Sequence, residues 1–202
     1  MPALPPPRDP QGPYRICCVC LGNICRSPMA EVVLREQLKK AGLGGKVVVD
    51  SAGTGDWHIG GRMDSKARRE LTRNGYDGES HRARQFQRSW LNERDLILAM
   101  DAANLRDLRA LAKPVRGASD GKDRHRIGSP THGHLPGGRA PVPPEGDQDR
   151  IRLFGEIAAL DGQDVPDPYY GSADDFAYVR ALLEKGMSHL VSQLAAMPEI
   201  SA

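Results

Sequence analysis

Short apolar segments alternate along the chain with longer segments in which apolar residues recur every three or four positions. Four short segments are typical of buried strands: residues 14–19, 46–51, 96–100 and 151–154. Four longer segments predict helices: residues 27–41, 102–112 and 172–196, and residues 64–74, which are polar but helical in composition. This alternation indicates the α/β class, and we predict a three-layer sandwich with a central four-stranded parallel sheet and helices on both faces.

Two stretches depart from this pattern. Residues 1–13 contain six prolines, and we predict a disordered, Pro-rich tail there. Residues 114–149 contain six prolines and seven glycines with few large apolar side chains, which predicts a flexible insertion. We expect residues 14–196 to form a single domain around that insertion.

Charge and hydropathy narrow the functional classes. The chain has 202 residues, with 28 Lys and Arg against 26 Asp and Glu, for a formal net charge of +2. This small excess argues against a dedicated nucleic-acid-binding protein. No apolar run approaches the roughly 20 residues of a membrane span, and the first ten residues lack the apolar core of a secretory signal. We therefore expect neither a nucleic-acid nor a membrane partner.

All four cysteines lie within nine residues: Cys17, Cys18, Cys20 and Cys25. Cysteines this close together cannot cross-link distant parts of a domain, which excludes a secreted disulfide framework. Reduced thiols in a cytoplasmic compartment are the better interpretation. Catalysis, redox switching and metal binding remain as roles for them.

The segment 20–27, Cys-Leu-Gly-Asn-Ile-Cys-Arg-Ser, joins the first predicted strand to the first predicted helix. Unpaired N–H groups at a helix N-terminus attract anions. Gly22 and Asn23 tolerate the backbone angles that a tight anion-binding loop needs. Arg26 adds a planar fork that can hold two phosphate oxygens. These groups favour the thiolate of Cys20, which predicts a nucleophile directed at a bound phosphate.

A second candidate segment is residues 165–171, Val-Pro-Asp-Pro-Tyr-Tyr-Gly. Asp167 lies between two prolines, so its backbone is stiff. A carboxyl held over a pocket with walls from Tyr169 and Tyr170 would be suited to general acid catalysis. Asp-Pro also begins many ordinary turns, so this segment alone decides little.

Together these motifs closely resemble the low-molecular-weight protein tyrosine phosphatases. The resemblance covers about residues 14–112 and 150–195, and it implies a flavodoxin-like fold. Its specific parts are the loop at 20–28 and the Asp-Pro-Tyr-Tyr-Gly at 167–171. Further matches lie at residues 50–54, 57–58, 80–85 and 100–101.

The resemblance implies a mechanism. Cys20 would form a phosphocysteine intermediate, Arg26 would bind the phosphoryl oxygens, and Asp167 would protonate the phenolate and then activate water. No metal or other cofactor is needed for such phosphoryl transfer. The implied substrates are phosphotyrosine proteins and small aryl phosphates, and we expect a monomer.

The resemblance also assigns supporting residues. The phosphate-binding loop would comprise Leu21, Gly22, Asn23, Ile24, Cys25, Arg26 and Ser27. Aromatic side chains would line the substrate cleft: Trp57, Tyr169 and Tyr170. Two further residues would brace the loop: His81 and Asp101. For Cys25, both packing beneath the loop and a reversible disulfide with Cys20, a protective device of the family, remain open.

Four other functions remain as alternatives. A thioredoxin-coupled arsenate reductase of this fold needs cysteines downstream of Cys25, and there are none. A protein-arginine phosphatase carries Thr in place of Ile24 and lacks a second tyrosine at Tyr170. Against a thiol module that binds metal or senses oxidants, the four cysteines lack a zinc-ligand spacing, and a strand would point Cys17 and Cys18 apart. An inactive phosphopeptide binder would not need all three catalytic residue types.

Overall fold

The computed structural model describes residues 3–113 and 147–201. Its elements follow one another in this order: β1 (Tyr14–Cys20), α1 (Arg26–Lys40), β2 (Val47–Gly53), α2 (Ser65–Arg73), the 3-10 helix η1 (Arg88–Asn92), β3 (Leu96–Ala99), α3 (Ala102–Ala112), the 3-10 helix η2 (Asp147–Arg150), β4 (Ile151–Leu153), α4 (Phe154–Ile157), α5 (Ala173–Ala195) and α6 (Pro198–Ser201). The four predicted strands and four predicted helices are all present, with bounds within two residues of those expected.

The four strands form one parallel sheet with the order β2-β1-β3-β4. The chain moves outward in one direction from β1 to β2 and returns to the other side of β1 for β3. The carboxyl end of β1 is therefore the point where the strand order reverses, which is where sheets of this kind bind ligands. The predicted fold class, a four-stranded parallel sheet between helices, is confirmed.

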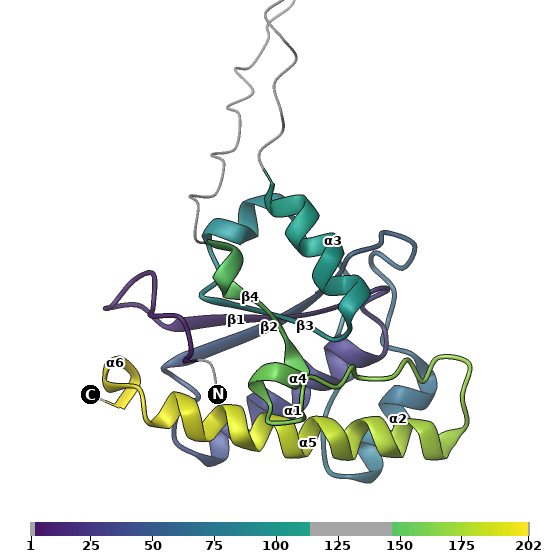
Figure 1. The fold of residues 1–202 in the computed structure, drawn as a ribbon. Helices are drawn as coiled ribbons and strands as arrows, with labels where there is room; N and C mark the ends of the chain where they lie inside the picture. The colour runs from purple at the N-terminus through teal and green to yellow at the C-terminus, as the bar shows by residue number, and fades with distance from the viewer. Residues whose placement is uncertain (1–2, 114–146, 202) are drawn as a thin grey trace, which may run out of the picture.

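Two apolar cores lie on opposite faces of the sheet, as the side-chain alternation of strands requires. On one face, Cys18 and Leu98 contact a large cluster with side chains of α1, α2 and α5. On the other, Cys17 and Ile97 contact a smaller cluster beneath α3 and η1. Figure 1 shows this layering, with α3 on one side of the sheet and α1, α2 and α5 on the other. In the described residues, no helix combines the length and hydropathy that crossing a membrane would require.

Side-chain caps fix where the helices that flank the site begin. The Asp64 carboxylate accepts hydrogen bonds from the backbone N–H groups of Lys66 and Ala67 at the start of α2. The Asp101 carboxylate accepts one from Asn104 N at the start of α3. Such caps satisfy N–H groups that have no partner within the helix. They hold both helices at fixed positions beside the carboxyl ends of the strands.

The N-terminal segment differs from the predicted disordered tail, because residues 3–13 follow a defined path on the domain. Arg8 N donates to the buried carboxylate of Asp95 over 2.6 Å, and Arg8 Nη2 donates to Leu91 O over 2.7 Å. The Tyr14 hydroxyl donates to Pro5 O over 2.9 Å. The proline-rich composition correctly predicts that this segment has no helix or strand. It does not reveal the hydrogen-bond partners, which for Arg8 lie more than 80 residues away in the sequence.

The predicted insertion at 114–149 lies outside the described residues, except that residues 147–149 belong to η2. The other predicted boundary, residue 196, is followed by α6, whose Ile200 packs into the larger core. The short helix α4 has no counterpart among the predicted elements. It begins directly after β4 and has only four residues, too few to give a periodic pattern.

Candidate active site

The loop between β1 and α1 lies at the carboxyl end of β1. Backbone bonds from the residues after β2 hold it: Thr54 N donates to Cys20 O and Gly55 N to Leu21 O, each over 2.9 Å. The loop lies so close to β2 that a Cβ atom on Gly53 would be 2.6 Å from Leu21 O. Glycine at position 53 is therefore a packing requirement of the loop.

The Cys20 thiol lies at the base of this loop and is only 3% exposed. Its Sγ atom accepts a hydrogen bond from Asn23 N over 3.3 Å and lies 3.1 Å from Ser27 Oγ. Asn23 reaches this position with a left-handed φ of +54°, as its tolerance of such angles predicts. Donors that face a sulfur atom stabilise its thiolate form.

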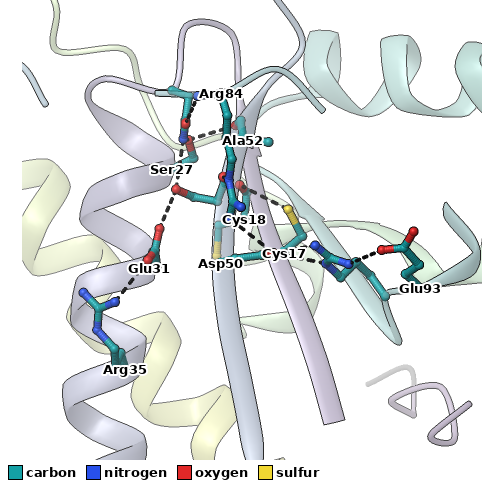
Figure 2. A network of polar contacts seen from close by, with 12 residues as sticks. Cys17, Cys18, Ser27, Glu31, Arg35, Asp50, Ala52, Arg84 and Glu93 are labelled. Carbon is teal, nitrogen blue, oxygen red and sulfur yellow. Dashed lines mark hydrogen bonds and ion pairs between the residues drawn. The ribbon is translucent and has the colours of Figure 1, made fainter. Parts of the chain in front are cut away.

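Asn23 is the centre of a buried polar network behind the loop, part of which is visible in Figure 2. Its Nδ2 group donates to Ser27 Oγ and to Ser51 Oγ, each over 2.9 Å. Its Oδ1 atom accepts from Arg84 N over 2.9 Å. His81 Nε2 lies 2.8 Å from Asn23 O and must be the donor there. Burial lowers the pKa of His81, and the hydrogen bond to Asn23 O acts in the opposite direction.

Arg26, the first residue of α1, is almost fully buried and holds two carboxylates. Its Nη1 donates to Asp101 over 2.5 Å, and its Nη2 donates to Asp167 over 2.7 Å. Burial opposes the charge of the guanidinium, but Cys20, Asp101 and Asp167 together hold its pKa above the ordinary value. Because Asp101 also caps α3, the Asp101 side chain connects Arg26 to that helix.

A cavity of about 380 Å³ opens above the loop, and it is lined by Cys20, Leu21, Gly22, Ile24, Cys25, Arg26, Trp57, His58, Asp167, Tyr169 and Tyr170. Tyr169 and Tyr170 meet edge to face with their ring centroids 4.8 Å apart. Lys66 Nζ donates to Tyr169 O and Gly171 O, which anchors this segment to α2. Trp57 is 70% exposed and Tyr170 96% exposed, so both rings stand at the rim of the cavity.

Most of the residues predicted for the site therefore meet in one cavity. The side chains of Asn23 and Ser27 lie behind the loop backbone and not in the cavity lining, while His81 and Asp101 contact Asn23 and Arg26 without lining the cavity. His58 lines the cavity but was not predicted as a site residue. In the sequence, the available signal was its position next to Trp57. In the structure, the His58 ring lies close to the loop, since a Cβ atom on Gly22 would be 3.0 Å from it.

The other three cysteines are free and buried. Burial raises the pKa of Cys17 and Cys18 well above the ordinary thiol value, and burial also raises that of Cys25. Each of these groups is therefore a neutral thiol, as expected of core residues. The predicted core role of Cys17 and Cys18 is confirmed, whereas the disulfide between Cys20 and Cys25 stays a prediction.

A parallel α/β sheet that carries this loop on its central strand defines a class of phosphatases. Within that class, the chain belongs to the low molecular weight phosphotyrosine protein phosphatase family, whose model matches residues 15–120 and 141–199. It is therefore a phosphatase with phosphoprotein substrates.

Individual relatives agree with this assignment. The low molecular weight protein-tyrosine-phosphatase of Streptomyces coelicolor is 40% identical over 89% of this chain and 92% of its own. The low molecular weight phosphotyrosine protein phosphatase of Schizosaccharomyces pombe is 37% identical over 80% of this chain and 85% of its own. The crystal structure of YfkJ from Bacillus subtilis is 31% identical, with a TM-score of 0.70 over 91% of this chain and 95% of that one.

Proposed function

We propose that this enzyme hydrolyses phosphotyrosine in two steps through a phosphocysteine on Cys20, without a metal ion. The observation that carries the proposal is the convergence of Cys20, Arg26 and Asp167 in one cavity with aromatic walls. A thiol nucleophile, a phosphate-binding guanidinium and a carboxyl group are together sufficient for phosphoryl transfer to and from sulfur.

In the first step the Cys20 thiolate attacks phosphorus and the bond to the tyrosine oxygen breaks. Asp167, in its protonated form, gives its proton to the departing phenolate. Arg26 binds the equatorial phosphoryl oxygens, whose charge is greatest in the transition state. In the structure, Arg26 Nη2 donates to the Asp167 carboxylate, so an incoming phosphate would replace that carboxylate as its acceptor. Because Asp167 is 45% exposed on its side chain, it has room to move toward the leaving group.

In the second step the Asp167 carboxylate takes a proton from a water molecule, which attacks phosphorus. The bond to Cys20 breaks and sulfur leaves as a thiolate. The Ser27 hydroxyl, 3.1 Å from Cys20 Sγ, is placed to donate a hydrogen bond to that thiolate. Inorganic phosphate and the starting enzyme result, and the proton on Asp167 serves the next cycle.

The walls of the cavity favour a flat aromatic ester. Trp57 and Tyr170 can contact the two faces of a ring at the rim, and Ile24 adds an apolar side chain beneath. Phosphotyrosine and small aryl phosphates fit this lining better than phosphoserine or phosphoarginine. Catalysis by a free thiol also requires a reducing compartment, which supports a cytoplasmic location.

The substrate class can be tested with three peptides that differ only in the phosphorylated residue. With a reductant and EDTA present, we expect the phosphotyrosine peptide to release phosphate at least about 100-fold faster than the phosphoserine and phosphoarginine peptides. EDTA should leave the rate unchanged, because no step uses a metal. Faster release from the phosphoarginine peptide, or loss of activity in EDTA that zinc or magnesium restores, would contradict the proposal.

A further inference from the structure

A chain of four hydrogen bonds connects a carboxylate on the outer side of α1 with the sulfur of Cys20. Glu31 Oε2 accepts from the Ser51 hydroxyl over 2.6 Å, and Ser51 Oγ accepts from Asn23 Nδ2 over 2.9 Å. Asn23 Nδ2 also donates to Ser27 Oγ over 2.9 Å, and Ser27 Oγ lies 3.1 Å from Cys20 Sγ. Figure 2 shows Glu31 at the outer end of these contacts, beside Arg35.

The carboxylate of Glu31 determines which group donates and which accepts in each of these hydrogen bonds. A carboxylate can only accept hydrogen bonds, so the single hydroxyl hydrogen of Ser51 points to Glu31. Ser51 Oγ is then available to Asn23 only as an acceptor, which suits the Nδ2 group that faces it. The amide orientation is fixed from the other side as well, because Asn23 Oδ1 accepts from Arg84 N.

This order of donors and acceptors determines where the Ser27 hydrogen can point. Its oxygen accepts from Asn23, so its own hydrogen remains free for one of two acceptors, Cys20 Sγ or Ala52 O, both 3.1 Å away. The hydrogen can point to Ala52 while sulfur carries the phosphoryl group and to sulfur when the thiolate forms. This arrangement supplies a hydrogen bond at the moment when negative charge develops on the leaving sulfur.

Loss of the acceptor at position 31 would remove one of the two constraints on the Asn23 amide. The Ser51 hydrogen could then turn toward Asn23, where it favours the opposite orientation of the amide, with Oδ1 facing Ser51 and Ser27, and only the hydrogen bond from Arg84 N would still oppose that orientation. In that orientation the Ser27 hydrogen would bind Asn23 Oδ1 in place of Cys20. We propose that Glu31 is a positioning residue that acts through Ser51 and Asn23 to keep the Ser27 hydrogen available to the Cys20 thiolate. This inference rests on the proposed function of Cys20 as nucleophile and leaving group.

Glu31 itself is far enough from the cavity to be tested separately from binding. It does not line the cavity, and its side chain is 16% exposed. Its second oxygen pairs with Arg35, one turn along α1, over 3.1 Å. Arg35 is 48% exposed on its side chain, and its ion pair is with Glu31, whereas the Ser51 hydroxyl donates to the other oxygen of Glu31. The two residues therefore form a matched pair, of which only Glu31 is joined to the loop.

The test is a double-mutant cycle in turnover of an aryl phosphate. We expect Glu31→Leu to lower kcat about tenfold, because a hydrogen bond to a charged group is lost from the positioning chain. The inhibition constant for inorganic phosphate should stay within about twofold, because Arg26 and the loop backbone are unchanged. In a Ser51→Ala background, Glu31→Leu should have no further effect, because the connection is already broken. The control Arg35→Gln should leave kcat at the wild-type value.

Three results for Glu31→Leu would overturn the inference: an unchanged kcat, an equal loss in both backgrounds, or a weakening of phosphate binding in parallel with kcat. The last would indicate general damage to the loop. If Arg35→Gln lowers kcat as much as Glu31→Leu, the effect belongs to the surface ion pair and the inference is also wrong. Absence of turnover by the wild-type enzyme would instead refute the proposed function.

Discussion

Replacing Cys20 by serine is expected to lower turnover of a phosphotyrosine peptide by about 10⁴-fold or more. In the proposed mechanism the Cys20 thiolate is the nucleophile, and Asn23 N donates a hydrogen bond to its Sγ atom over 3.3 Å. A serine hydroxyl in the same place keeps its proton at neutral pH and is a far weaker nucleophile. The loop backbone and Arg26 remain, so calorimetry should find that Cys20→Ser binds inorganic phosphate about as tightly as the wild type.

A matched control is available three residues earlier. Cys17 is fully buried in the smaller core and does not line the cavity. Cys17→Ala should lower the free energy of unfolding by about 1 kcal/mol, because it removes one buried heavy atom, and should leave kcat unchanged. If Cys20→Ser retains more than about 1% of the wild-type turnover, Cys20 is not the nucleophile.

Replacing Arg26 by lysine is expected to lower kcat/KM for the same peptide by about 10³-fold. Lysine keeps the positive charge but loses the planar fork that can hold two phosphoryl oxygens at once. It also cannot contact Asp101 and Asp167 from one rigid group, as Arg26 does. Unlike Cys20→Ser, this variant should bind inorganic phosphate more weakly, because Arg26 acts in both the ground state and the transition state.

The control is a second arginine that pairs with an aspartate outside the cavity. Arg94 binds Asp50 over 2.7 Å and stacks on Trp90, 4.8 Å from the ring centroid. Arg94→Lys should lower the thermal midpoint while kcat/KM stays within about twofold of the wild-type value. An Arg26→Lys enzyme with more than a tenth of the wild-type kcat/KM would show that the guanidinium geometry is dispensable.

Local sequence signals were sufficient for the framework of the protein. The apolar segments placed the strands and helices within two residues of their observed bounds, because each element satisfies its own local pattern. The loop from Cys20 to Arg26 was readable for the same reason: its residue types suit a strand-to-helix junction. The residues that give this loop its chemistry are consecutive in the sequence, so they can be recognised together.

Contacts between distant segments were not readable in this way. His81 and Asp101 entered through family resemblance, since a histidine or aspartate alone does not reveal that it contacts Asn23 or Arg26. Glu31 has the pattern of an ordinary solvent-facing helix residue, and only the position of Ser51 on β2 connects it to the loop. The partners of Arg8 lie across the fold, so composition predicted a free tail where the chain is held.

The most direct test of the central claim is to trap the intermediate in an Asp167→Asn enzyme with 4-nitrophenyl phosphate. Nitrophenolate leaves without a proton, so the first step should proceed, whereas the second step lacks its base. We predict a burst of one nitrophenolate per active site, and a denatured protein that carries one phosphoryl group on Cys20. Slow linear release without a burst, or a phosphoryl group on another residue, would contradict the account.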